Sequence, residues 1–229
     1  MNFTYKLASR ISKFMKSKGF TRRGKLFYRI QDNIAYCICF ESPSGKAYTW
    51  FFVMPLFIPS EYVYLSYGNR LENLCRFPSI SKDSADEELE LWVHYLMHVL
   101  EEKVFPYFER IGSASSLLEY IQQEYLYICE YVCTSPCNRG KLEAYLSFYL
   151  GDREAFIKAA EKYRGAIDHS SFFPQLKNKW LERLDELERI IMNDPSQIES
   201  YCRGSISFTM QHCFSPKKRE PKMGEGSPS

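Results

Sequence analysis

The chain has 229 residues, of which 45% are hydrophobic and 25% charged, and its formal net charge is +2. This composition is typical of a globular protein with a sizeable core, and the small net charge excludes a surface that is basic throughout. No segment approaches the ~18 consecutive apolar residues of a membrane span, and basic residues interrupt the N-terminal segment where a signal peptide would be continuously apolar. We therefore expect a cytoplasmic protein that does not enter a membrane, with its eight cysteines as reduced thiols.

The first predicted element is an amphipathic helix that ends before Gly19. This glycine suits the left-handed position that follows many helices, and Phe20 is placed to fold back on the last turn. Apolar residues at helical spacing form one face of the helix, and basic residues form another. The apolar face consists of Phe3, Leu7, Ile11 and Phe14.

Four strands are predicted after this helix. They span residues 26–30, 34–41, 47–54 and 61–67. Short links with the residue types of turns join the first three, and successive short links favour an antiparallel meander. Because the second and third strands carry apolar residues on both faces, we expect both faces of the sheet to be covered.

From residue 83 onward the spacing of apolar residues is helical. Asp83 or Ser84 is expected to cap the first of these helices, and Pro106 is expected to kink or end it because proline lacks a backbone donor. Gly151 and Asp152 join two later helices, since glycine suits a helix end and aspartate a helix start. The later helical segments are expected at 115–133, 139–150, 152–164, 173–193 and 198–214.

These elements predict an α+β fold in which an N-terminal helix and a four-stranded antiparallel meander pack with a C-terminal helical region. Residues 1–112 are expected to hold the first helix, the sheet and a covering helix. Residues 113–214 are expected to form the helical region, either within the same domain or as a second one. Residues 215–229 are rich in Lys, Pro, Gly and Ser, lack aromatic residues and are expected to be disordered.

The strongest functional signal is the distribution of charge near the N-terminus. Nine basic residues and no acidic residue lie between Met1 and Ile30, whereas residues 83–102 are rich in Asp and Glu. Such asymmetry is typical of proteins that bind a partner of opposite charge. The predicted binding surface, called here the N-terminal basic patch, consists of Lys6, Arg10, Lys13, Arg22, Arg23 and Lys25.

Three interpretations of this patch remain open. It would dock an acidic protein surface, where complementary charge mainly raises the association rate and the selectivity. It would also track the phosphates of a nucleic acid, with Phe27 or Tyr28 stacking on a base. Alternatively, the basic and acidic segments face each other within the fold, and the charges neutralise each other there.

A stripe of metal-binding residue types lies on the helix predicted after residue 83. Histidines four positions apart can share a zinc ion, and carboxylates one turn away can complete such a site. The stripe lies opposite the apolar face, however, where polar residues are expected in any solvent-exposed helix, so we expect neither a metal nor another cofactor. The stripe consists of Glu90, His94, His98 and Glu102.

Catalytic motifs are absent from the sequence. It contains no Gly-x-Ser-x-Gly elbow, no Walker-type loop, no Gly-x-Gly-x-x-Gly and no Cys-x-x-Cys pair. Cys129, Cys133 and Cys137 are spaced by four, but Pro136 intervenes, and buried thiols are the favoured interpretation. The sequence therefore favours a protein without catalytic activity and does not exclude an enzyme.

The run Gly19-Phe20-Thr21-Arg22-Arg23-Gly24-Lys25-Leu26-Phe27-Tyr28-Arg29, which follows an amphipathic helix, resembles the opening of the bacterial domain-of-unknown-function 4304 family. The resemblance covers roughly residues 1–70 and extends to a strand end at Phe40-Glu41-Ser42. It implies a bacterial cytoplasmic α+β protein, because the family has no established activity. By analogy with small bacterial families of this fold class that neutralise toxins, we expect a protein-binding module similar to immunity proteins. Nucleic-acid association and metal-dependent catalysis are the alternatives.

Overall fold

The computed structural model describes residues 2–123 and 135–215. The predicted disordered tail therefore lies outside the described residues, apart from Ser215. The same is true of Cys129, Cys133 and the second half of the helix predicted at 115–133.

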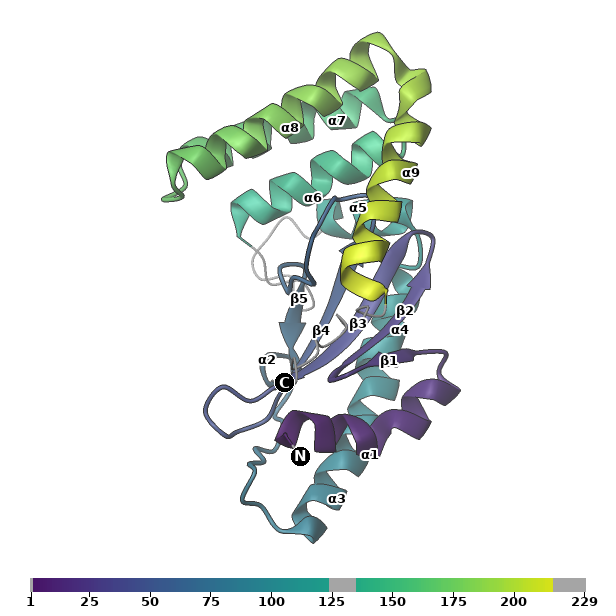
Figure 1. The fold of residues 1–229 in the computed structure, drawn as a ribbon, viewed down its shortest axis with the longest axis vertical. Helices are drawn as coiled ribbons and strands as arrows, with labels where there is room; N and C mark the ends of the chain where they lie inside the picture. Colours follow the sequence, from purple (N-terminus) through teal and green to yellow (C-terminus); the bar gives the residue numbers. More distant parts are fainter. Residues whose placement is uncertain (1, 124–134, 216–229) are drawn as a thin grey trace, which may run out of the picture.

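Helix α1 (Phe3–Ser17) precedes a single antiparallel sheet of five strands in the order β1-β2-β3-β4-β5 (Figure 1). The strands are β1 (Thr21–Arg23), β2 (Leu26–Gln31), β3 (Ile34–Glu41), β4 (Tyr48–Pro55) and β5 (Gly68–Arg70). Each strand pairs with its neighbour in sequence, so the predicted α+β class and antiparallel meander are confirmed. The short strand β1, which pairs Arg22 with Phe27, was not predicted.

Two local predictions in this half of the chain are confirmed. After α1, Gly19 has a φ of +80°, and Phe20 donates its backbone N–H to the carbonyl of Met15 at 3.0 Å. This is the expected glycine-terminated helix end. Between β2 and β3, Asp32 and Asn33 both have positive φ, the conformation that a tight two-residue hairpin requires.

The strand predicted at 61–67 was wrong. The edge strand β5 begins at Gly68, which pairs with Phe52 of β4. A Cβ at Gly68 would lie only 2.1 Å from the carbonyl oxygen of Phe51, so only glycine allows this close pairing. Val63 and Leu65 instead pack against one face of the sheet, which explains the strand-like alternation of apolar residues.

Helices form most of the remaining chain. They are α2 (Leu71–Leu74), α3 (Asp86–Val99), the π-helical turn η1 (Leu100–Val104), α4 (Phe105–Arg110), α5 (Ala114–Gln123), α6 (Pro136–Tyr149), α7 (Arg153–Asp168), α8 (Pro174–Asn193), the 3-10 turn η2 (Pro195–Gln197), α9 (Ile198–Thr209) and the π-helical turn η3 (Met210–Phe214). Gly151 and Asp152 join α6 to α7 as expected, and the side chain of Asp152 accepts from the N–H of Ala155 at 3.0 Å.

Two details of α3 differ from the predictions. Neither Asp83 nor Ser84 caps the helix, because it begins one residue later, with Ala85 at the N-cap position. A hydrogen bond at the start of α3 comes instead from the side chain of Glu88, which accepts from the N–H of Ala85 at 3.2 Å. Pro106 does not end the helix either, since the wider π-helical turn η1 precedes it and the chain continues as α4.

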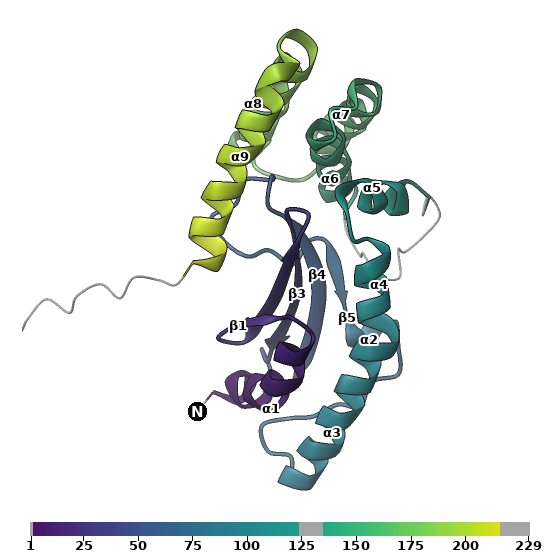
Figure 2. The same cartoon turned by 90° about the vertical axis from the view of Figure 1, so that its right-hand side faces the viewer.

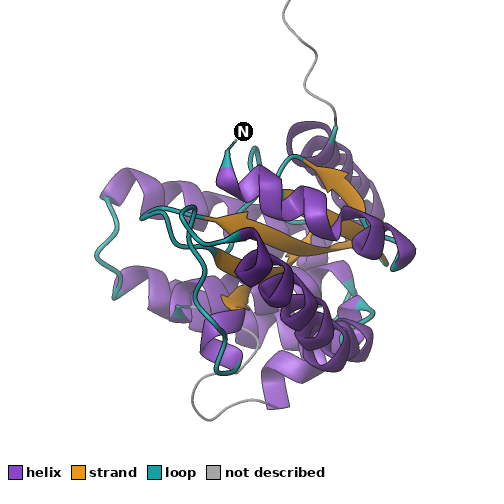
Figure 3. Cartoon of the chain, turned by 90° about the horizontal axis from the view of Figure 1, so that it is seen from below, coloured by secondary structure: helices purple, strands orange, loops and turns teal. Residues whose placement is uncertain are grey.

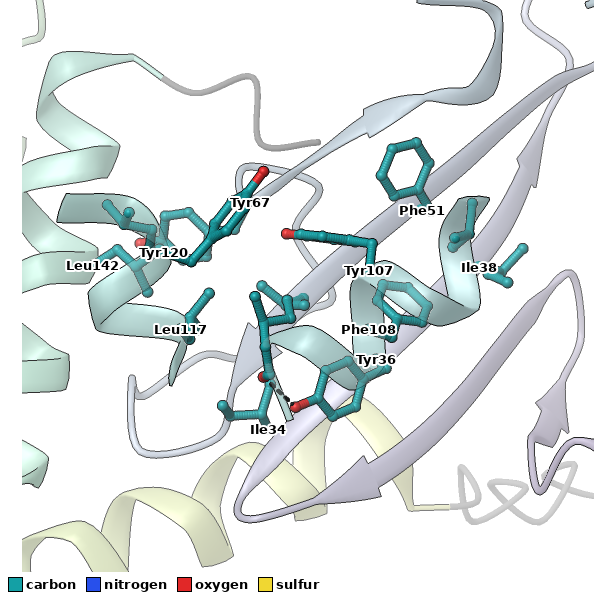
Figure 4. Close-up of a cluster of buried hydrophobic side chains, with 14 of the residues drawn as sticks. Ile34, Tyr36, Ile38, Phe51, Tyr67, Tyr107, Phe108, Leu117, Tyr120 and Leu142 are labelled. Atoms are coloured by element: carbon teal, nitrogen blue, oxygen red, sulfur yellow. Dashed lines mark hydrogen bonds between the residues drawn. The ribbon is translucent and has the colours of Figure 1, made fainter. Parts of the chain in front are cut away.

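Helices α1, α3 and α4 cover one face of the sheet (Figure 2), and Figure 3 shows the strands with helices packed on both sides. Phe27, Ile38 and Phe51 from three strands belong to the core beneath them. Tyr36 packs on Phe108 of α4, and its hydroxyl donates to the carbonyl of Ile111 at 2.8 Å (Figure 4). The same continuous core extends into the helical region, where it includes the following buried residues: Leu117, Leu142, Phe156 and Leu184.

The C-terminal end of the described chain covers the other face of the sheet. Helix α9 and η3 return to this face (Figure 2), where Cys213 and Phe214 join the cluster formed by residues such as Cys37 and Phe52. Phe214 packs on Tyr28 with ring centroids 4.7 Å apart. The expectation that both faces of the sheet are covered is therefore confirmed.

Candidate functional site

The first part of the N-terminal basic patch faces the acidic helix α3. Lys6 Nζ lies 3.0 Å from Oδ1 of Asp86, and Arg10 Nη2 lies 2.8 Å from the same oxygen. Arg10 also forms an ion pair with Glu90. Hydrogen bonding and charge from Lys6, followed by the charge of Arg10, lower the pKa of Asp86. Two of the six predicted cations thus neutralise α3, which is one of the three interpretations that the sequence allowed.

The other four residues of the patch differ in whether their side chains form hydrogen bonds. Arg22 donates to the carbonyls of Gly24 and Tyr5, at 2.9 and 3.3 Å, and Arg23 donates to the carbonyl of Cys213. These arginines therefore hold β1 to its surroundings. Within the described part of the chain, the side chains of Lys13 and Lys25 form no hydrogen bond or ion pair. Lys13 is exposed, and Lys25 is half-buried.

The histidine stripe of α3 lies on the solvent side of the helix, with all four side chains exposed. Its polar groups are bonded locally. His94 Nδ1 lies 2.8 Å from the carbonyl oxygen of Glu90, and His98 Nε2 lies 3.1 Å from Oε2 of Glu102. Over residues 2–123 and 135–215, no group of three or more His, Cys, Asp or Glu side chains is arranged to hold a metal ion.

A different basic site lies between α6 and α8, beside the segment from Pro59 to Tyr67 and next to Phe208 of α9. We call it the α6–α8 pocket. Its volume is about 440 Å³, within the range of ligand-binding pockets. It is lined by Pro59, Ser60, Glu61, Tyr62, Tyr64, Ser66, Tyr67, Asn138, Lys141, Leu176, Lys179, Trp180, Arg183 and Phe208.

Three cations line this pocket without an ion pair to any residue that the structure describes. Lys141 comes from α6, and Lys179 and Arg183 come from successive turns of α8. None of the ion pairs between described residues includes them. Burial, and secondly the charge of Arg183, lower the pKa of Lys141 to about 8. The only carboxylate among the lining residues is that of Glu61, so positive charge predominates.

Exposed aromatic rings surround these cations. Tyr62 is 70% exposed and Phe208 is 37% exposed, and both line the α6–α8 pocket. Trp180 packs edge-on against Phe172, with centroids 5.0 Å apart, and the adjacent Phe173 is 81% exposed. Single exposed rings are common, but a group of them around one pocket is typical of an interaction site.

Two larger hollows offer less distinctive chemistry. One, of about 710 Å³, lies beside the α6–α7 turn and contains Arg203, which is paired with Glu199. The other, of about 780 Å³, is lined partly by η3 and contains Arg23, which is bonded to the carbonyl of Cys213, and Lys25 together with the carboxylates of Glu41 and Glu61. The α6–α8 pocket is therefore the strongest candidate for binding an anion, because three cations without ion pairs line it beside one carboxylate.

The sequence predictions missed this pocket because its residues come from four segments that are distant in the chain. One signal was available on α8, where Lys179 and Arg183 are four residues apart and therefore share a helix face. Trp180, between them, lines the same pocket and is only partly buried. The contribution of Lys141 follows only from the packing of α6 in three dimensions.

The arrangement can bind an anion and pack against apolar groups, and it contains no paired nucleophile and base. No helix within the described residues combines the length and apolarity needed to cross a membrane. Comparison of the sequence and structure with protein-family models, curated proteins and solved structures yields no match. The resemblance of residues 1–70 to the domain-of-unknown-function 4304 family thus stays a prediction.

Proposed function

We propose that this chain is a non-enzymatic binding module that accepts an acidic segment of a partner protein in the α6–α8 pocket. The observation that carries the proposal is the convergence of Lys141, Lys179 and Arg183 without a carboxylate partner among the described residues. Complementary charge accelerates association and disfavours partners of the wrong sign. An acidic segment is the occupant that matches the charge of this pocket.

The surrounding rings favour a protein as the partner. Tyr and Trp are enriched in protein–protein interfaces, where they bury a large area at small entropic cost. Tyr62, Trp180 and Phe208 all line the pocket. Nucleic-acid binding is the second candidate in chemical terms, but the ion pairs of Lys6 and Arg10 with α3 leave fewer cations to follow a phosphate backbone. A toxin neutralised by an immunity protein is one kind of partner that fits the proposal.

The proposal is tested with a fluorescein-labelled peptide that alternates Glu with Leu and Tyr, and with a matched peptide in which Gln replaces every Glu. Fluorescence anisotropy measures the dissociation constants. We expect the Glu peptide to bind, and the double variant Lys179→Glu, Arg183→Glu to weaken binding by at least about tenfold, as charge reversal at an interface does. The matched control is Lys158→Glu, which reverses a cation of α7 that is 68% exposed and pairs with Glu154.

Two outcomes would contradict the proposal. Equal affinity for the Glu and Gln peptides would show that the cations do not select an acidic partner. Tighter binding of a labelled single-stranded DNA, with a steep loss of affinity as salt is added, would favour the nucleic-acid alternative. Circular dichroism of each variant confirms that the charge reversals leave the fold intact.

A further inference from the structure

We infer, building on the proposed function, that Lys141 and Arg183 together hold a single carboxylate group of the partner inside the α6–α8 pocket. Lys141 projects from α6 and Arg183 from α8, so the two cations reach the pocket from different helices. They would form the selective centre of the site, whereas Lys179, which is more exposed, would contribute to long-range attraction.

Lys141 and Arg183 repel each other where they line the same pocket. Burial, and after it the charge of Arg183, lower the pKa of Lys141. An anion placed between two like charges removes their repulsion and replaces the hydration that burial has taken from them. The proximity of the two cations thus has an electrostatic cost that a bound carboxylate would relieve.

The other groups around Lys141 do not supply this anion. Cys137 lies nearby, but burial raises the pKa of its thiol, so it remains protonated near neutral pH. The ring of Tyr145 lies below the ammonium group, with its centroid 6.0 Å from Nζ. Burial also raises the pKa of the phenols of Tyr145 and Tyr163, which therefore carry no charge. Glu61 lines the pocket without forming an ion pair with any described cation.

A carboxylate suits the site better than a phosphate. Lys141 and Arg183 offer at most two positive charges, and the pKa of Lys141 near 8 means that one of them is partly lost in weakly basic solution. Glu61 at the same pocket would repel a dianion more strongly than a monoanion. A single Asp or Glu side chain, with its apolar neighbours against the rings, is the ligand that this arrangement recognises.

The test uses the whole chain and does not depend on the peptide. Acetic anhydride at limiting concentration acetylates lysines in their neutral form, and peptide mass spectrometry gives the rate at Lys141 as a function of pH. The carboxylate probe is N-acetylglutamate α-methylamide, whose only charge is its side-chain carboxylate, and inorganic phosphate is the comparison. We expect this probe to raise the pKa of Lys141 by about one unit, which slows its acetylation about tenfold at a pH below that pKa.

Lys158, which is exposed and paired with Glu154, is the internal control and should react at the same rate with and without the probe. Arg183→Met should abolish the protection of Lys141, whereas Arg183→Lys should retain part of it. An unchanged rate at Lys141, or protection by phosphate alone, would overturn the inference. Either result is compatible with binding of the acidic peptide, so the proposed function would fail only in its own test.

Discussion

The close approach of α6 and α7 at a glycine predicts an unusual response to a glycine-to-alanine substitution. Gly140 lies in α6, directly against α7. A Cβ built on Gly140 would lie 2.9 Å from Cα of Tyr163 and 3.2 Å from its backbone nitrogen. Because backbone atoms cannot move aside as a flexible side chain can, Gly140→Ala is expected to push the two helices apart.

A matched substitution isolates the energy of this contact. Gly165 lies in α7, and a Cβ added there has no neighbour within 4 Å. In a helix, alanine is favoured over glycine by about 1 kcal/mol, so both substitutions share this gain. Overpacking costs about 1–3 kcal/mol. Gly165→Ala should therefore stabilise the protein by up to about 1 kcal/mol, and Gly140→Ala should be less stable than Gly165→Ala by about 1–3 kcal/mol.

Urea denaturation followed by circular dichroism measures these free energies of unfolding. The expected difference corresponds to a separation in melting temperature of about 2–4 °C per kcal/mol for a chain of this size. Gly204→Ala in α9 is a second control, since a Cβ at Gly204 also has open space. Equal stabilisation by Gly140→Ala and Gly165→Ala would refute the argument that α6 and α7 meet through this glycine.

Three further predictions concern the core, a buried ion pair and the candidate site. Phe214→Ala should destabilise the fold by about 3 kcal/mol, because it removes a nearly buried ring from the second face of the sheet. A loss of stability below about 1 kcal/mol in urea denaturation would contradict the packing of η3 on the sheet. Glu143→Ala should cost about 2 kcal/mol, since it removes a buried carboxylate that pairs with the partly buried Arg139 at 2.9 Å and with Lys162 at 3.5 Å. Glu154→Ala, at an exposed ion pair, should by contrast have almost no effect on the same measurement. Lys141→Met should stabilise the protein below pH 8. The pKa of Lys141 falls from its usual 10.5 to about 8 in the folded state, so the charged form of this lysine disfavours folding. This gain should disappear as the pH rises above 10.5, and a gain that does not depend on pH would contradict the assigned burial of the ammonium group.

Local sequence signals predicted most of the secondary structure. The helix end at Gly19, the hairpin at Asp32 and Asn33, and the junction at Gly151 each depend on the preferences of one or two residues, and all three are confirmed. The errors arose where tertiary contacts determine the secondary structure. Val63 and Leu65 alternate like strand residues but pack across a sheet face, and a π-helical turn accommodates Pro106.

The candidate site was much less predictable than the fold. The charge run near the N-terminus was visible in the sequence, but the ion pairs that Lys6 and Arg10 form with α3 depend on how α1 lies beside that helix. Conversely, Lys141 of α6 and Arg183 of α8 are separated in sequence by the whole of α7 and line one pocket only in the folded chain. A sequence reports which charges exist, whereas the packing of the helices decides which of them remain available.

The return of α9 and η3 to the sheet has a consequence for the synthesis of the protein. Arg23 bonds to the carbonyl of Cys213, 190 positions later in the chain, and Phe214 covers Tyr28. The strands β1 to β4 leave the ribosome long before this cover exists, so one apolar face of the nascent sheet stays open to the cell until the last helix is made. Transiently exposed apolar surface of this kind invites aggregation. Premature termination before α9 is thus expected to give a chain in which the core beneath α1, α3 and α4 still forms. Such a chain is expected to depend on chaperones to remain in solution.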